Sequence, residues 1–237
     1  MEKIRLDKYI CDLGRATRSE SRDMIRSGRV RVDGKTVTVP ETKVDPLAAA
    51  VTLDGEDLVW ARHHYYMMNK PAGVLTATED RRKMTVLDLL PKDLRRMGLF
   101  PVGRLDRDTR GLLLLTDDGD FAHRVISPKF EVEKTYDAAV DGTPDETDVA
   151  AFADGLVLRD GTKCRPARLE VLGEGRCLVT VTEGKYHQVK RMLASRGKPV
   201  TALRRLSIGG LRLPENLAEG AVVELSEDDL CRVFMVR

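Results

Sequence analysis

The sequence predicts an α+β protein built from two unequal domains, and two observations carry that prediction. Its 237 residues are about one and a half times the ~150 residues of an average domain, which favours one large or two unequal domains. Predicted strands outnumber predicted helices and do not alternate with them in a strand–helix–strand rhythm. That arrangement is typical of a mixed or antiparallel sheet.

Composition excludes several other classes of protein. Hydrophobic residues make up 42% of the chain, but no apolar run approaches the ~20 residues that span a bilayer. The first seven residues contain no apolar stretch of the kind that marks a signal peptide. The four cysteines and four histidines have neither the pairing nor the spacing of a zinc site. We therefore expect a soluble, reduced, cytoplasmic protein without a metal site or a disulfide scaffold.

Charge is segregated along a chain whose net charge is only +2. Basic residues outnumber acidic ones ten to six in residues 1–35, nine to six in 79–110 and eight to one in 182–212. Residues 141–160 instead contain six acidic residues and one arginine. Each basic run taken alone could be an ordinary solvated face. Three of them with an acidic counterweight favour a surface that binds nucleic acid.

The first part of the chain predicts two short helices followed by a hairpin. Residues 4–13 have mostly helical spacing of apolar side chains and end at Gly14, which favours a helix C-terminus. Residues 17–20 have the capping-box pattern, which predicts a helix that stops at residues 27–28. Alternating segments on either side of a tight turn at residues 33–34 predict the hairpin.

Three stretches of this module match the sequence pattern of a known domain, at residues 5–10, 17–22 and 28–35. Together they resemble the S4 domain, a small RNA-binding module of a ribosomal protein and of several RNA-modifying enzymes. Arg18, Arg22 and Arg26 recur every four residues on one helical face, where guanidinium groups can bind RNA phosphates. The resemblance adds Arg29 to these contacts. With one more strand at 51–53 and a connector, we expect the S4 domain to occupy residues 1–60 and a second domain residues 61–237.

The second domain is predicted to begin with a strand at 65–68 and a loop enforced by Pro71 and Gly73. The elements expected after that loop are a capped helix opening at 85–90, a strand at 112–116, a helix at 121–126 and a strand at 133–140. The remainder predicts short strands between Gly- and Pro-rich turns, with one helix after Glu183-Gly184.

Asp106 is a candidate functional carboxylate because of the residues that surround it in the sequence. It lies among Arg104, Arg107 and Arg110, in a glycine-flanked loop just before a strongly apolar strand. A carboxylate among guanidinium groups stays ionised, which suits either a structural ion pair or a catalytic group. The residues alone leave both interpretations open.

Five stretches of the second domain look like sequence motifs of one protein family and follow one another in the order found there. They lie at residues 69–73, 103–119, 133–136, 183–192 and 203–210. Together they resemble the motifs of the pseudouridine synthases that modify ribosomal RNA. Residues 117–124 and 133–136 are most similar to the RsuA branch, which acts on uridine 516 of 16S rRNA, whereas the related RluB, RluE and RluF branches act on 23S rRNA. The resemblance implies an S4 domain followed by a pseudouridine synthase domain with a mixed, mainly antiparallel sheet.

The resemblance also implies the roles of particular residues. Asp106 would supply the catalytic carboxylate, Lys190 the cation that faces it, and Tyr136 a ring that stacks on the target base. Arg104 would enter the space left by the flipped base, and Leu203 would pack under the site. Two further residues of the motifs are expected to contact RNA, Lys185 and His187.

Pseudouridine formation breaks the C1′–N1 bond, turns the uracil and rejoins it through C5. No net redox change occurs and no phosphate is transferred, so we expect no cofactor and no metal. The base must leave its stack to be reached.

We expect the partner to be ribosomal RNA, with 16S favoured, or a small-subunit assembly intermediate, and we expect a bacterial monomer without a membrane partner. Two alternatives stay open: a 23S rRNA pseudouridine synthase of the same family, and a non-catalytic S4-type RNA-binding or ribosome assembly factor. Intact Asp106, Tyr136 and Lys190 weigh against the non-catalytic one.

Overall fold

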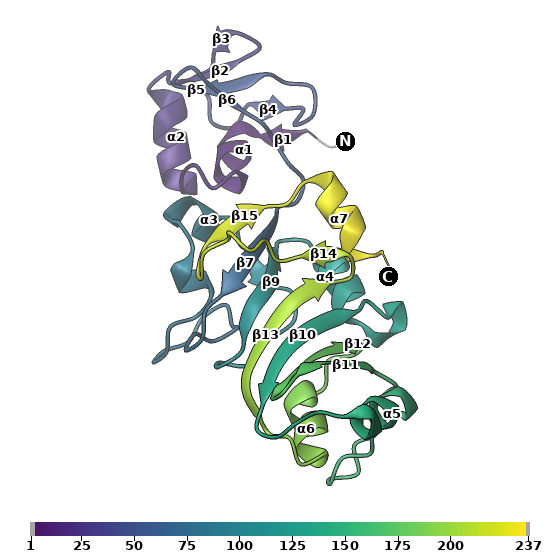
Figure 1. Cartoon of the computed structure of the whole chain (residues 1–237). Helices are drawn as coiled ribbons and strands as arrows, with labels where there is room; N and C mark the ends of the chain where they lie inside the picture. Colours follow the sequence, from purple (N-terminus) through teal and green to yellow (C-terminus); the bar gives the residue numbers. More distant parts are fainter. Residues whose placement is uncertain (1–2, 236–237) are drawn as a thin grey trace. The chain divides into compact units, whose positions relative to one another are not determined.

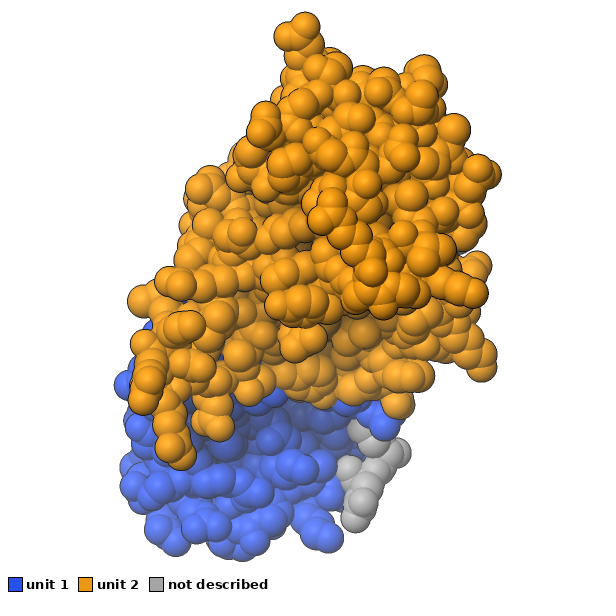
Figure 2. Space-filling model, turned by 90° about the horizontal axis from the view of Figure 1, so that it is seen from below, with its two compact units in different colours: residues 1–64, 87–99 blue, residues 65–86, 100–237 orange. Residues whose placement is uncertain are grey.

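The computed structural model describes residues 3–235 and divides them into two compact units (Figure 2). Unit 1 contains residues up to 64 together with 87–99, and unit 2 contains residues 65–86 and the chain from 100 onward. Residues 87–99 join unit 1 because their helix packs closely on it: a Cβ on Gly14 would lie 2.5 Å from the carbonyl oxygen of Asp93. A domain boundary near residue 60 stays a proposal.

Unit 1 consists of short helices and two small sheets (Figure 1). Its elements are β1 (Ile4–Arg5), α1 (Leu6–Asp12), α2 (Arg18–Arg26), β2 (Val30–Val32), β3 (Lys35–Thr36), β4 (Lys43–Val44), β5 (Val51–Leu53), β6 (Glu56–Leu58), the 3₁₀ turn η1 (Leu87–Leu89) and α3 (Lys92–Arg96). An antiparallel sheet has the strand order β3-β2-β5-β6, and β1 pairs with β4.

Local sequence signals account for the first elements of unit 1. The Thr17 hydroxyl accepts a hydrogen bond from the Glu20 amide at 3.2 Å, and the Glu20 carboxylate accepts one from the Thr17 amide at 2.7 Å. This capping box confirms the predicted start of α2. Asp33 and Gly34 both have positive φ, at 50° and 76°, as the predicted tight hairpin turn requires. Ile4 does not belong to the first helix, because it pairs with β4.

Unit 2 is built on one nine-stranded sheet among the described residues. Its elements are β7 (Tyr65–Lys70), β8 (Phe100–Pro101), β9 (Arg110–Thr116), α4 (Gly119–Ile126), the 3₁₀ turn η2 (Pro128–Phe130), β10 (Lys134–Val140), α5 (Glu146–Asp154), β11 (Arg168–Gly173), β12 (Arg176–Val181), α6 (Gln188–Ser195), β13 (Val200–Ile208), β14 (Leu211–Arg212), β15 (Val222–Glu224) and α7 (Glu227–Val233). The main strand order is β11-β12-β10-β13-β9-β7-β15.

The sheet of unit 2 is mixed and mainly antiparallel, as predicted. Only the pairing of β9 with β13 is parallel among the ladders of the described chain. Gly111 makes that pairing possible, because a Cβ at this position would lie 2.2 Å from the backbone oxygen of Arg205. Its φ of 103° also lies in a region that side chains disfavour. The glycine therefore fixes how the loop before β9 enters the centre of the sheet.

Two hydrophobic clusters support this sheet. One joins α5 and α6 to β10 and β12, and includes the fully buried side chains of Phe152, Met192, Leu193 and Cys177. The other joins α4 and α7 to β7 and β9, where the Phe121 ring meets those of Tyr65 and Phe234 edge-on. The two clusters pack against the central strands of the sheet, and the loops of the site extend from these strands.

The structure differs from the sequence predictions in several helices of the described chain. Residues 85–90 do not open an α-helix, because the amide of Val86 bonds to Leu75 in an extended bridge and only one 3₁₀ turn follows before Pro91. Helices α5 and α7 were not predicted, although Asp145 and Ser226 cap them with capping boxes.

No helix within residues 3–235 has the length and apolarity needed to cross a bilayer.

Candidate active site

A cavity of about 830 Å³ opens in unit 2 beside the loop that connects β8 to β9, and a smaller hollow shares part of its wall. All seven residues of the second domain that the sequence singled out line one or both of them. The larger cavity is lined by Arg104, Asp106, Tyr136, Lys185 and His187, and the smaller hollow also by Lys190 and Leu203. Residues separated by almost one hundred positions in the sequence therefore meet at one place.

Asp106 faces two nitrogen groups that reach it from the start of α6. The Nζ atom of Lys190 lies 3.0 Å from its Oδ2 atom, and Nε2 of His187 lies 3.3 Å from its Oδ1 atom. Lys190 also contacts Asp108 at 2.6 Å. Burial opposes the charge of Lys190, but hydrogen bonds to Asp108 and Asp106 outweigh it and raise the pKa of the lysine. Lys190 is therefore a permanent cation beside the Asp106 carboxylate.

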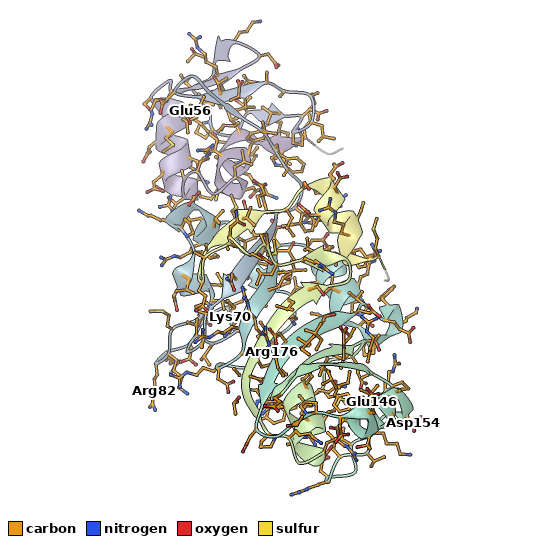
Figure 3. The ribbon with its side chains drawn as sticks, in the orientation of Figure 1. Glu56, Lys70, Arg82, Glu146, Asp154 and Arg176 are labelled. Carbon is orange, nitrogen blue, oxygen red and sulfur yellow. The ribbon has the colours of Figure 1, made fainter. Side chains whose placement is uncertain are left out.

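The loop that carries Asp106 is held in place by a buried lysine at the end of β7 (Figure 3). Lys70 is fully buried, and its Nζ atom lies within hydrogen-bond distance of four carbonyl oxygens, at 2.9–3.4 Å, among which it shares its three protons. The accepting carbonyls belong to Pro71, Asp106, Arg107 and Thr109. Burial lowers the pKa of Lys70 to about 8. The contacts tie the Asp106 backbone to the sheet.

Tyr136 on β10 is oriented by a buried arginine of the neighbouring strand β13. Arg205 is 4% exposed; its Nε atom donates to the carbonyl of Leu112 at 2.8 Å, and its Nη1 atom donates to the Tyr136 hydroxyl at 3.4 Å. The guanidinium carbon lies 5.9 Å from the centre of the tyrosine ring. Arg205 thus fixes both the ring and the hydroxyl of Tyr136 at the cavity wall.

A second brace holds the segment between β12 and α6. The buried Glu183 carboxylate accepts hydrogen bonds from Gln188 Nε2 at 2.8 Å and from Lys185 Nζ at 2.7 Å. Burial opposes the ionisation of Glu183, but these bonds, led by that from Lys185, and one from the Arg165 amide keep its pKa below the usual value. Lys185, predicted to contact RNA, is therefore tied to Glu183 in this structure.

In unit 1, two of the four arginines expected to bind RNA phosphates, Arg18 and Arg22, lie around one buried acid together with Arg5. Asp7 is fully buried and accepts hydrogen bonds from Arg5, Arg18 and Arg22 at 2.9–3.1 Å. Burial would raise the pKa of Asp7, but hydrogen bonds from Arg5 and Arg22 and the charge of Arg18 lower it to about 2. Arg18 and Arg22 remain partly exposed, so the cluster still presents positive charge at the surface.

The two other arginines of this set lie apart from the Asp7 cluster. Arg29 pairs with Asp54. Arg26 is more exposed and makes a 3.9 Å contact with Asp23. Arg26 is therefore the most accessible of the four predicted RNA contacts.

Sequence reasoning missed three residues that build the site, Lys70, Arg205 and Glu183. Lys70 and Arg205 have hydrogen-bond partners distant in sequence, whereas Glu183 bonds to Lys185, Gln188 and the Arg165 amide, at most 18 positions away. Lys70 left a local signal, because it follows an apolar run and Asn69 and precedes Pro71. Within residues 3–235, no group of three or more histidine, cysteine or acidic side chains is arranged to hold a metal ion.

Comparison with known proteins identifies both parts of the chain. Residues 64–195 match the family model described as RNA pseudouridylate synthase, and residues 4–46 match the S4 domain. In a crystal structure of a pseudouridylate synthase, the similarity covers 97% of this chain and 99% of the other, with 36% identity and a TM-score of 0.69.

Curated relatives match over almost their whole length. An uncharacterized RNA pseudouridine synthase of Bacillus subtilis, YtzG, is 42% identical over 96% of this chain and 97% of its own. The ribosomal small subunit pseudouridine synthase A of Vibrio cholerae is 40% identical over 98% of this chain and all of its own. The protein of the same name from Escherichia coli is 39% identical over 97% of this chain and all of its own.

Proposed function

Since the chain belongs to the RNA pseudouridylate synthase family, we propose that it isomerises one uridine of 16S ribosomal RNA, the one numbered 516. The family makes it an isomerase that acts on RNA uridine. The 16S target is supported by full-length relatives that are named ribosomal small subunit pseudouridine synthase A. We further propose that the enzyme works as a monomer in the cytoplasm, on 16S rRNA or on a small-subunit assembly intermediate.

The pair of Asp106 and Lys190 is the observation that carries the catalytic part of the proposal. The 3.0 Å contact places a cation beside the carboxylate in a cavity that a bound nucleotide would close off from water. In this role the Asp106 carboxylate attacks C1′, adds to the base or removes a sugar proton, and each of these steps needs its ionised form. Lys190 stabilises that form without taking part in bond making.

The other residues of the cavity serve the base rather than the sugar. Tyr136 stacks on the extruded uracil, and its hydroxyl, oriented by Arg205 at 3.4 Å, assists removal of the C5 proton after the base has turned. Arg104, exposed at the mouth of the cavity, enters the space that the flipped base leaves. Leu203, buried in the wall of the smaller hollow that Asp106 and Tyr136 also line, closes the site from below.

Unit 1 supplies affinity for the RNA in this proposal. The cluster of Arg5, Arg18 and Arg22 around Asp7 and the more exposed Arg26 bind phosphates of a folded RNA. Such contacts depend on charge and geometry and not on base sequence.

Mapping of pseudouridines tests the proposal in cells. Pseudouridine at position 516 of 16S rRNA should disappear when the gene is deleted, and return with the wild-type gene but not with Asp106→Asn. Loss of a 23S pseudouridine instead would establish the 23S alternative. An unchanged map of both RNAs would leave the non-catalytic alternative and reject the proposed function.

A further inference from the structure

We propose that Tyr186 and His187 form a binding site for an unpaired RNA base adjacent to the target uridine. The inference rests on the proposed function, because it assigns a second nucleotide subsite at the same cavity. It concerns the ring of Tyr186, a residue to which the proposed function gives no role at the target base.

The two rings form a stacked pair with one open side. Their centres lie 3.9 Å apart and their planes differ by 17°. Tyr186 nevertheless remains 70% exposed. Because one face of the tyrosine ring covers the imidazole, the exposed area belongs to the remainder of the ring, including its opposite face. A large aromatic surface is thus presented to solvent at the rim of the cavity.

The pair is held rigidly beside the catalytic carboxylate. His187 has a left-handed backbone with a φ of 47°, a conformation that costs energy for a residue other than glycine and often marks functional sites. This backbone brings Nε2 of His187 within 3.3 Å of Asp106. The hydrogen bond from the Lys185 amide to Gln188 Oε1, at 2.9 Å, spans the pair. These contacts hold the imidazole on which the tyrosine ring stacks, which reduces the entropic cost of placing a base on the pair.

The surroundings indicate a nucleotide rather than a protein side chain. Arg104 and Arg107 are exposed in the facing loop, and Lys190 lies behind His187 on the first turn of α6. A nucleotide presents an aromatic face together with a phosphate, so it complements both the ring and the cations. Extrusion of the target uridine also deprives its neighbours of a stacking partner, and Tyr186 offers them a replacement.

The experiment measures RNA affinity in the Asp106→Asn background, so that binding is separated from turnover. Tyr186→Ala removes the ring, and Tyr186→Phe keeps it. Phe130→Ala is the matched control, because Phe130 is another exposed aromatic residue that contacts a histidine, His123, but lies outside the cavity lining. The first probe is a synthetic 16S fragment around uridine 516, with each neighbour of the target replaced in turn by an abasic residue. The second probe is single-stranded oligoadenylate.

Stacking predicts a specific pattern of affinities. Tyr186→Ala should weaken binding of the intact fragment about 10-fold, whereas Tyr186→Phe and Phe130→Ala should bind like the parent. At one position next to the target, the abasic replacement should weaken RNA binding by the parent protein by a similar factor. The same replacement should not weaken RNA binding by Tyr186→Ala any further. Additive losses at every abasic position would overturn the proposed base contact.

The second probe separates this inference from the proposed function. If the fragment neither binds nor is isomerised by the wild-type enzyme, the proposed 16S target fails. Oligoadenylate still tests the ring, because stacking tolerates any base. Weaker binding of oligoadenylate by Tyr186→Ala than by Tyr186→Phe supports the subsite, and equal binding by both overturns it.

Discussion

Lys190 on α6 lies with its Nζ atom 3.0 Å from Oδ2 of Asp106, a residue 84 positions earlier in the chain. The same ammonium group contacts Asp108 at 2.6 Å. One cation therefore pairs with two carboxylates of a single loop. We expect this pairing to hold Asp106 in place when RNA excludes water from the cavity.

Lys190→Met keeps most of the side-chain volume and removes the charge. Without the ammonium group Asp106 loses the cation that faces it at 3.0 Å, so the single-turnover rate at saturating RNA should fall about 10-fold or more. Lys190→Arg keeps the charge and should retain most of the activity. An unchanged rate of Lys190→Met at saturating RNA, together with a raised dissociation constant, would instead make Lys190 a phosphate contact.

Lys70→Met tests the support of the catalytic loop. The change removes the ammonium donor from four carbonyl oxygens, of which those of Asp106 and Arg107 keep a backbone N–H partner. The free energy of unfolding should therefore fall by about 2 kcal/mol. The rate at saturating RNA should fall as well, because Asp106 is no longer held. Urea unfolding and single-turnover assays measure the two effects. Lys35→Met, at an exposed strand position, is the stability control. Equal stability of the two variants would contradict a supporting role for Lys70.

Asp7 predicts how the stability of unit 1 depends on pH. The folded-state pKa of Asp7 is lowered from 3.8 to about 2 by its arginine partners, so the folded state binds fewer protons than the unfolded state between these values. The stabilising contribution of Asp7 is then complete above about pH 4 and is lost as the pH falls toward 2. Trp60, the single tryptophan, packs against the core of unit 1 and reports its unfolding.

The comparison variant is Asp7→Asn, which cannot ionise. Its urea midpoint should lie below that of the wild type at pH 5, and the difference should shrink as the pH falls below 4. A difference that stays constant down to pH 2.5 would show that the charge of Asp7 does not stabilise unit 1.

Arg26→Gln tests the RNA-binding surface of unit 1 without disturbing Asp7. The slope of log affinity against log salt for a 16S fragment should fall by about 1, with no change in stability because Arg26 is largely exposed. Arg159→Gln, which removes an exposed arginine in the acidic stretch 141–160, should leave the slope unchanged. If both substitutions change the slope equally, the effect is one of net charge and not of a local phosphate contact.

Local signals predicted the elements that depend on neighbouring residues. The capping box of α2 and the turn at Asp33-Gly34 are complete within four residues, so no distant contact is needed to form them. Helices α5 and α7 carry equally good capping boxes, at Asp145 and Ser226. They escaped prediction because α5 is rich in alanine and α7 has acidic residues at three consecutive positions, which obscures the helical spacing of apolar side chains.

Apart from Asp106, which its arginine neighbours single out, the residues of the site were predictable only from the family motifs. The motifs singled out Asp106, Tyr136 and Lys190, and the fold brings Asp106 to Lys190 and Tyr136 to the same cavity wall. The buried charges that position them were not predictable. Lys70 donates to carbonyls of a loop some 40 residues away, and Arg205 donates to a carbonyl of β9. Such partners are set by the tertiary fold, and no spacing in the sequence records them.

The most direct measurement compares wild-type enzyme with Asp106→Asn on 16S rRNA from cells that lack the gene. Single-turnover formation of pseudouridine and the RNA dissociation constant are measured on the same preparations. The substitution is nearly isosteric and removes only the carboxylate charge. We predict an unchanged dissociation constant and no detectable pseudouridine with Asp106→Asn, against complete conversion of one uridine by the wild type. Turnover by Asp106→Asn close to the wild-type rate would contradict the assignment of Asp106 as the catalytic carboxylate.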